Sequence, residues 1–197
     1  MDTIPLIITV STLILATFGF IFWFARAATR NNHKQMQLLS EHFRLHAEKR
    51  KSFWQLPILT GELGGFPIQI KVEPSPASEA NEMEVLLTVP QQPFNFIIRR
   101  KLKIGKQKTD VELMDSQVDD YYIIRTEFPD QTQRFLQDKE IKQKLYDFKD
   151  DMFLGTSIRM QGSEMRYLMT FANVGDKKRP KIISTIELMV FLAGRLV

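Results

Sequence analysis

The stretch IPLIITVSTLILATFGFIFWF, residues 4–24, decides how this chain is organised, because it holds 21 residues and no charged side chain. As an α-helix rising 1.5 Å per residue it would span about 31 Å, close to the roughly 30 Å hydrocarbon core of a bilayer. Pro5 falls in the first turn, where a missing N–H costs little. The stretch therefore predicts a single transmembrane helix.

The residues that flank this stretch predict its orientation. Trp23 lies near its C-terminal end and Arg26, Arg30 and Lys34 follow, whereas the three residues before it include no Lys or Arg. Trp is enriched at membrane interfaces, and Lys and Arg are enriched in cytoplasmic flanks. We therefore predict that Trp23, Arg26 and Arg30 lie at the membrane interface, with the N-terminus outside and the rest of the chain in the cytoplasm.

A cleaved signal peptide is the alternative interpretation. The sequence Ala25-Arg26-Ala27 has the small-x-small form of a cleavage site. However, a signal peptide begins with a positive region and has a shorter apolar run, whereas this chain begins with Met1-Asp2. Residues 1–30 are therefore predicted to form a retained anchor.

A juxtamembrane helix is predicted over residues 31–51. Met36, Leu39, Phe43 and Ala47 recur at a spacing of three to four residues, which is typical of a helix with one apolar face. Docking of this face onto the following domain is the simplest interpretation. The helix would continue the transmembrane segment as a stalk.

The three histidines of the chain, at positions 33, 42 and 46, all lie in this predicted helix. His42 and His46 are four residues apart, so one helix face would present both. Two imidazoles are too few for a closed metal site. We interpret them as surface histidines, with a metal-binding or pH-sensing role as the alternative, and we predict no metal ligands.

Residues 52–197 predict one α+β domain. Gly64-Gly65 between two alternating runs indicates a hairpin turn, and Gln161-Gly162-Ser163 indicates a second. Because the strands come in runs, the pattern favours an antiparallel sheet with helices on one face. The predicted strands cover residues 56–62, 66–73, 84–89, 94–100, 121–128, 155–160 and 165–173, and the predicted helices cover residues 132–148 and 181–196. Residues 101–119 are charged and predict a loop, with a short strand over 111–114 as the alternative.

Composition excludes several kinds of chemistry. The chain has no cysteine, and no histidine follows position 46, so the domain cannot hold a Ser-His-Asp triad or a Cys-His pair. Asp119-Asp120 could be paired acids, but adjacent residues of a strand point to opposite faces, and a solvated loop is the simpler interpretation. The glycines near positions 61 and 105 lack nucleotide-binding spacing. We predict no catalytic residue and no cofactor.

A basic run is the most distinctive local feature of the domain. It places six cations within ten residues: Arg99, Arg100, Lys101, Lys103, Lys106 and Lys108. The run could contact anionic lipid headgroups or a partner protein. It could equally pair with the acids that follow it or face water. Residues 52–197 hold twenty Lys/Arg and twenty Asp/Glu, so this neutral domain is predicted not to bind nucleic acid.

The last predicted helix is apolar nearly all round its circumference. Such a helix either is buried on several sides or contacts something outside its own domain. Both interpretations stay open at this point. It is too short to cross a bilayer, and it carries Glu187 and Arg195.

The layout of the chain resembles uncharacterised bacterial single-pass membrane-anchored α+β proteins. The resemblance rests on the N-terminal span, the hairpin from Thr60 to Gly65, the strand 121–128 that leads through Pro129-Asp130 into a helix, and the closing hairpin and helix. It implies a bacterial inner membrane and assigns no role to any residue.

These observations favour a non-enzymatic, membrane-tethered interaction domain. Its expected role is that of an accessory or scaffold subunit in a larger membrane complex, with the lipid bilayer and other protein subunits as partners. A peripheral module that binds anionic lipid through the basic run is the alternative. An enzyme that works through carboxylates or a lysine is a further alternative.

Overall fold

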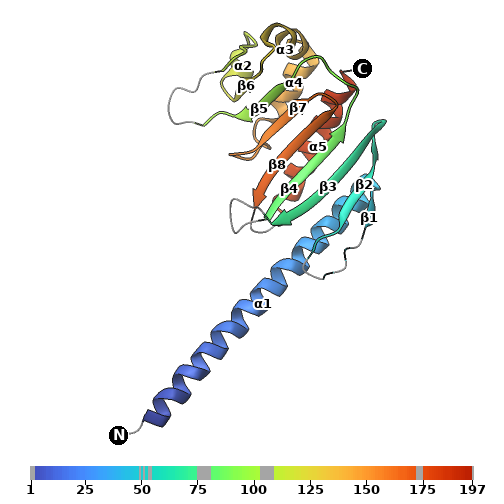
Figure 1. Cartoon of the computed structure of the whole chain (residues 1–197). Helices are drawn as coiled ribbons and strands as arrows, with labels where there is room; N and C mark the ends of the chain where they lie inside the picture. The colour runs from blue at the N-terminus through green and yellow to red at the C-terminus, as the bar shows by residue number, and fades with distance from the viewer. Residues whose placement is uncertain are drawn as a thin grey trace.

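A computed structural model describes residues 3–48, 50, 52, 55–74, 81–102, 109–171 and 175–196. A long helix, α1 (Thr3–Phe43), projects from a domain built on one sheet (Figure 1). Within these residues α1 is the one helix long and apolar enough to cross a membrane, and none of its most apolar window is buried against the protein. The structure thus contains a helix with the length and apolarity that the sequence predicted.

The described residues of the domain form one eight-stranded sheet in which every neighbouring pair is antiparallel. Its strand order is β1-β2-β3-β4-β8-β7-β5-β6. The strands are β1 (His46–Glu48), β2 (Ile58–Leu63), β3 (Phe66–Pro74), β4 (Asn81–Thr88), β5 (Phe96–Arg100), β6 (Tyr122–Arg125), β7 (Ser157–Gln161) and β8 (Glu164–Phe171).

Both predicted hairpins are confirmed. In the first, Gly64 and Gly65 have φ angles of 61° and 87° and connect the paired residues Leu63 and Phe66. Two left-handed residues make a type I′ turn, whose twist matches that of the strands and which favours glycine. In the second, Gly162 takes φ 61° between β7 and β8.

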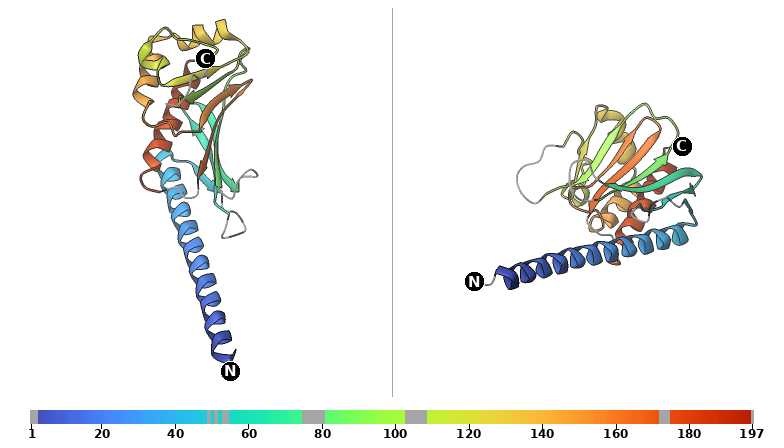
Figure 2. Two further views of the ribbon diagram at one scale, coloured as in Figure 1. Left: turned by 90° about the vertical axis from the view of Figure 1, so that its left-hand side faces the viewer. Right: turned by 60° about the horizontal axis from the view of Figure 1, so that its bottom comes forward.

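The sheet has one dry face and one wet face, because side chains alternate along each strand. On β4, Met83, Val85 and Leu87 are fully buried. On the opposite face of the same strand, Glu84 forms ion pairs with Lys71 at 2.6 Å and with Arg166 at 3.4 Å. Helices α4 (Lys139–Phe148) and α5 (Arg179–Gly194) lie on the dry side (Figure 2). The predicted antiparallel α+β fold with helices on one face is confirmed.

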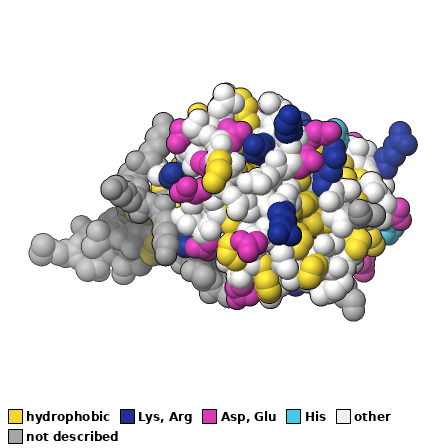
Figure 3. Space-filling view, turned by 90° about the horizontal axis from the view of Figure 1, so that it is seen from above, with side chains coloured by type: hydrophobic (Ala, Val, Ile, Leu, Met, Phe, Trp, Pro, Cys, Tyr) yellow, Lys and Arg dark blue, Asp and Glu magenta, His cyan; other side chains and the backbone are white. Residues whose placement is uncertain are grey.

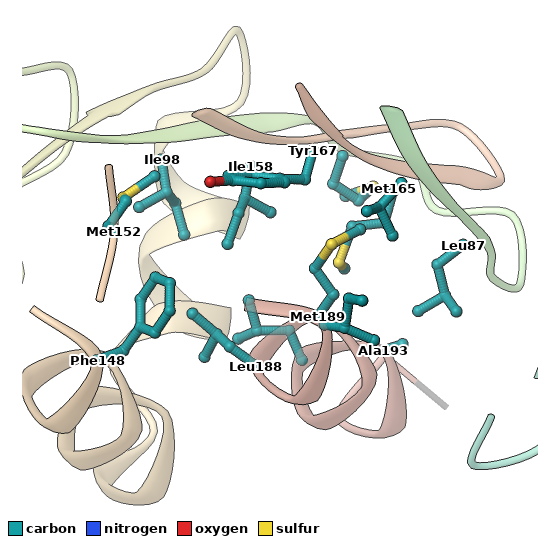
Figure 4. Close-up of a cluster of buried hydrophobic side chains, with 14 of the residues drawn as sticks. Leu87, Ile98, Phe148, Met152, Ile158, Met165, Tyr167, Leu188, Met189 and Ala193 are labelled. Carbon is teal, nitrogen blue, oxygen red and sulfur yellow. The ribbon is translucent and has the colours of Figure 1, made fainter. Parts of the chain in front are cut away.

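The closing helix α5 is a core helix. Ile182, Ile186, Leu188, Met189 and Leu192 are each at most 1% exposed. Figure 4 shows α5 side chains facing the sheet, with Leu188 toward Phe148 of α4. The apolar circumference noted in the sequence therefore serves packing against both the sheet and its neighbouring helices.

The single helix predicted over residues 132–148 is wrong. The chain forms α3 (Pro129–Leu136) and then starts α4 afresh at Lys139. The carboxylate of Asp138 accepts hydrogen bonds from the backbone amides of Glu140 at 2.8 Å and Ile141 at 3.2 Å. An N-cap aspartate therefore divides the run, because it satisfies amides that a continuous helix would pair internally.

Residues 111–114 form no strand, which leaves the loop interpretation of this segment, and the strand predicted over 121–128 is shorter, spanning Tyr122–Arg125. A short helix, α2 (Ser116–Asp119), follows Asp115, which caps it by accepting from Gln117 N at 3.1 Å. Met114 takes a φ angle of 51°, which a strand does not accommodate.

Candidate functional site

The last third of α1 enters the hydrophobic core of the domain. Gln35, Met36 and Leu39 are at most 1% exposed, whereas Leu13 is 68% exposed and Trp23 is 64% exposed. The helix is unbroken between these two environments. The apolar spacing at positions 36 and 39 thus docks the helix on the domain, as the sequence predicted.

The predicted juxtamembrane helix ends earlier than position 51. The N–H of Leu45 donates to the carbonyl of Ser40 at 2.9 Å, the N–H of Arg44 donates to the carbonyl of Glu41 at 3.4 Å, and Arg44 takes a φ angle of 55°. These two bonds form a Schellman cap with arginine in the position that usually holds glycine. The cap turns the chain back so that His46 begins β1.

This early end separates the two histidines that the sequence placed on one helix face. His42 lies in the last turn of α1, where its ring meets that of Phe43 edge-on with centroids 4.7 Å apart. His46 lies in a strand. Within the described part of the chain, no group of three or more His, Cys, Asp or Glu lies close enough to hold a metal ion.

The glycines near position 61 bring elements together. A Cβ at Gly61 would lie 2.7 Å from Cδ2 of Leu45, the residue that follows the cap. A Cβ at Gly64 would lie 2.7 Å from Cγ1 of Val190 in α5. The segment that lacked nucleotide-binding spacing therefore lets β2 and its turn approach the end of α1 and the closing helix.

A polar clamp joins α1 to the start of α5. Nε2 of Gln35 donates to Oδ1 of Asp176 at 3.0 Å, and Nη1 of Arg179 donates to Oε1 of Gln35 at 2.7 Å. Nη1 of Arg179 also lies 3.1 Å from Oδ1 of Asp176, which closes the triangle. The hydrogen bond from Gln35 and the neighbouring Arg179 hold the pKa of Asp176 below its ordinary value.

Two cavities flank α1 just C-terminal to its apolar part. One, of about 530 Å³, is lined by Arg30, His33, Lys34, Gln37, Ala47, Arg50, Ser52, Gln55 and Pro57. The other, of about 470 Å³, is lined by Thr29, Asn32, Arg50, Gln55, Leu56, Val72, Glu73 and Asn81. Arg50 and Gln55 line both cavities and so separate them. We call the first the root cavity, since it lies where α1 joins the domain.

The residues predicted at the membrane interface lie on the projecting part of α1. Trp23 packs near Phe20 with ring centroids 6.3 Å apart. Arg26 and Arg30 are exposed one and two turns further along. Their contact with a bilayer remains a prediction, and Arg30 also lines the root cavity.

The basic run begins on β5, next to the edge strand β6 and far across the sheet from β1 and β2, where α1 docks. Arg99 is exposed on the wet face. Arg100 donates to the carbonyl of Met152 at 3.1 Å, and Nζ of Lys101 lies 3.4 Å from the carbonyl of Asp119. Lys103, Lys106 and Lys108 lie outside the described residues, and contact of the run with lipid or a partner remains a prediction.

The acids at 119–120 do not form a pair for proton transfer. The carboxylate of Asp119 accepts from the backbone amides of Leu113 at 2.9 Å and Asp115 at 3.0 Å. Asp119 is the last residue of the short helix α2. The sequence-based argument against an acid pair assumed that Asp119 and Asp120 lie in a strand, and that assumption is wrong. The role of Asp119 here is structural, because both oxygens are used to fix a loop.

Charges are mixed at the end of the domain away from α1. Acidic and basic side chains lie interspersed with hydrophobic ones on that face (Figure 3). Side chains of both signs therefore occur together on this surface.

Sequence reasoning missed Gln35, Arg50, Asp176 and Arg179 as members of the junction. Gln35 and Arg179 are 144 positions apart, and no local pattern connects them. The one available signal was a glutamine within the apolar face of the predicted juxtamembrane helix, because a buried amide needs hydrogen-bond partners from elsewhere.

Comparison with known proteins gives a structural likeness. No family model matches the chain, and no curated protein matches it in sequence. A solved structure, that of the mycobacterial trehalose monomycolate transport factor A, TtfA, superposes with a TM-score of 0.55 at 10% sequence identity. The match covers 87% of this chain and 97% of that one. At this identity, the chain is similar to the transport factor in fold.

Proposed function

We propose that this protein is a membrane-anchored interaction module, which holds its sheet domain at a fixed height and orientation beside a bilayer as an accessory or scaffold subunit. Residues 1–30 serve as the anchor, residues 31–51 join it to the domain, and residues 52–197 present the interaction surfaces. The N-terminus lies outside and the domain lies in the cytoplasm at a bacterial inner membrane.

The continuity of α1 carries this proposal. A single helix has an exposed apolar part and a root buried in the domain core, so no loop intervenes between the span and the domain. The cap at Arg44 and the clamp at Gln35 add fixed contacts at the root. A protein that only needed to stay near the membrane would be served by a flexible linker.

Two further observations support an interaction role. The wet face of the sheet is uncovered by helices in the described structure, and it offers charged groups such as Arg99 and Arg159. The protein that shares this fold is named as a transport factor for trehalose monomycolate. An accessory role beside a membrane transport system is consistent with both.

Purification from native membranes in a mild detergent tests the proposal. We expect the full-length protein to elute as a complex with at least one other protein in a fixed stoichiometry. Inserting two alanines after Ala27 turns the domain by about 200° around the helix axis, whereas inserting seven turns it by about 20°. The variant with two inserted alanines should no longer form the complex. The variant with seven changes the distance of the domain from the membrane at nearly constant orientation, and so tests whether that distance matters.

The outcome that would contradict the proposal is a protein that elutes as a partner-free monomer in every detergent that preserves its fold. Retention of the complex by the two-residue insertion would contradict the fixed orientation. Both variants must first be shown to reach the membrane and fold.

A further inference from the structure

The root cavity presents a stripe of basic and polar side chains from α1. Arg30, His33, Lys34 and Gln37 are spaced i, i+3, i+4 and i+7, so they share one side of the helix. The opposite wall includes Ala47, Arg50, Ser52, Gln55 and Pro57. A volume of about 530 Å³ is within the range of small-molecule sites.

The charge of the lining is one-sided. Arg30, Lys34 and Arg50 are cationic, and no Asp or Glu is among the described residues that line the cavity. Arg50 forms an ion pair with Glu73 at 2.9 Å, on the side of the neighbouring cavity. Lys34 acts electrostatically on Asp176. Arg30 and Lys34 are exposed, and within the described part of the chain neither forms an ion pair.

The position of the cavity along α1 indicates that a bound anion would come from the lipid headgroups. Arg30 lies six residues beyond Phe24, which is about 9 Å along a helix. The headgroup layer outside the hydrocarbon core is about 5–8 Å deep on each side. Of the residues from α1 that line the cavity, Arg30 lies nearest the apolar part of the helix. Its backbone is therefore just beyond the headgroup layer, and its long side chain can extend back toward the headgroups.

We propose that the root cavity binds the phosphate-bearing headgroup of an anionic phospholipid, with Arg30 and Lys34 as its main ligands. A phosphate in the cavity would accept charge-assisted hydrogen bonds from these two cations, which a neutral ligand would not form. This proposal rests on the membrane anchoring of α1 proposed above. It is separate from the basic run that begins at Arg99, which lies near the other edge of the sheet.

Native mass spectrometry of the full-length protein in detergent, titrated with phosphatidylglycerol, tests the proposal. The test variant is Arg30→Gln/Lys34→Gln. The matched control is Arg134→Gln/Lys139→Gln, which removes the same charge from exposed positions on α3 and α4. We expect the wild type and the control to bind one phosphatidylglycerol, and the test variant to bind it about thirtyfold more weakly, the factor for two cations at a charged leaflet.

Three results would overturn the assignment. The first is equal binding of phosphatidylglycerol by the wild type, the test variant and the control, and the second is wild-type binding of phosphatidylcholine as tight as that of phosphatidylglycerol. The third is displacement of the lipid by millimolar inorganic phosphate, which would mark a site for free phosphate. Sedimentation with membranes after alkaline carbonate extraction separates this proposal from the anchor itself. If the wild type fails to sediment, both proposals fail. If all three proteins sediment but bind phosphatidylglycerol alike, the cavity assignment alone fails.

Discussion

Nη1 of Arg179 lies 2.7 Å from Oε1 of Gln35, which joins the first turn of the closing helix to the root of the anchor helix across 144 positions of sequence. Gln35 is fully buried, and its amide is satisfied by this bond, by the bond to Asp176 and by a longer one of 3.5 Å to Oδ1 of Asn31. The contact explains how a helix with few apolar residues in its domain-facing third stays fixed to the core. It also makes the junction sensitive to single substitutions.

Replacing Arg179 with methionine should destabilise the protein. The change leaves Oε1 of the buried Gln35 without its donor, and an unsatisfied buried acceptor costs about 1–3 kcal/mol. Urea unfolding of the full-length protein in detergent micelles, followed by near-UV circular dichroism, measures the effect. Arg134→Met is the control, because Arg134 is exposed and its loss should change the free energy of unfolding by less than about 0.5 kcal/mol. Equal stability of the two variants would contradict the clamp.

The clamp should weaken in acid. The pKa of Asp176 is held below its ordinary value of 3.8, so its contribution to stability is complete above that pH and is lost as the pH falls through the lowered pKa. Asp176→Asn cannot lose this contribution on acidification. We expect the melting temperature to drop less between pH 6 and pH 3 in Asp176→Asn than in the wild type. An equal drop in both proteins would show that Asp176 has no such role.

The two halves of α1 should respond differently to the same substitution. Leu39 is fully buried, and Leu39→Ala should lower the free energy of unfolding of the domain by about 2–5 kcal/mol, through lost burial and the cavity left behind. Leu13 is 68% exposed, and Leu13→Ala should leave domain stability unchanged. The same urea titration compares them. Similar losses at both positions would mean that the apolar part of α1 packs on the protein.

The end of α1 offers a stabilising substitution. Arg44 takes a φ angle of 55°, where an L-residue costs about 1–2 kcal/mol and glycine adds about 0.5–1 kcal/mol of unfolded-state entropy. Arg44→Gly should therefore stabilise the protein by about 0.5–1 kcal/mol. Glu41→Gly, three residues earlier and within the helix, should destabilise it by a similar amount. If both changes destabilise the protein, Arg44 does not form the cap described here.

The sequence predicted those features of the fold that a local residue pattern determines. Uncharged length indicated the span, glycine pairs indicated both hairpins, and alternation indicated a sheet with one wet face. It failed where one side chain overrides a continuing pattern. The apolar spacing at 36, 39 and 43 continues through Ala47, but the cap at Arg44 ends the helix. The apolar residues from 135 to 148 suit one helix, but Asp138 divides them.

The root of the anchor could be predicted only in part. Arg30 was expected at the interface from its position after the span, and Met36 and Leu39 were expected to dock. The cavity also needs Arg50 and Gln55, which reach it because the chain reverses after Arg44. The clamp needs residues near position 176. Long-range geometry of this kind leaves no periodic trace in a single sequence.

The distance distribution between the anchor and the domain in a bilayer tests the central claim most directly. The chain has no cysteine, so spin labels at Ala27→Cys and Lys139→Cys face no background labelling. Thr88→Cys with Lys139→Cys provides a reference within the domain. Measured by pulsed electron paramagnetic resonance in nanodiscs, the Ala27–Lys139 pair should give one population no broader than the reference. A broad or divided distribution beside a narrow reference would contradict a rigid connection between anchor and domain.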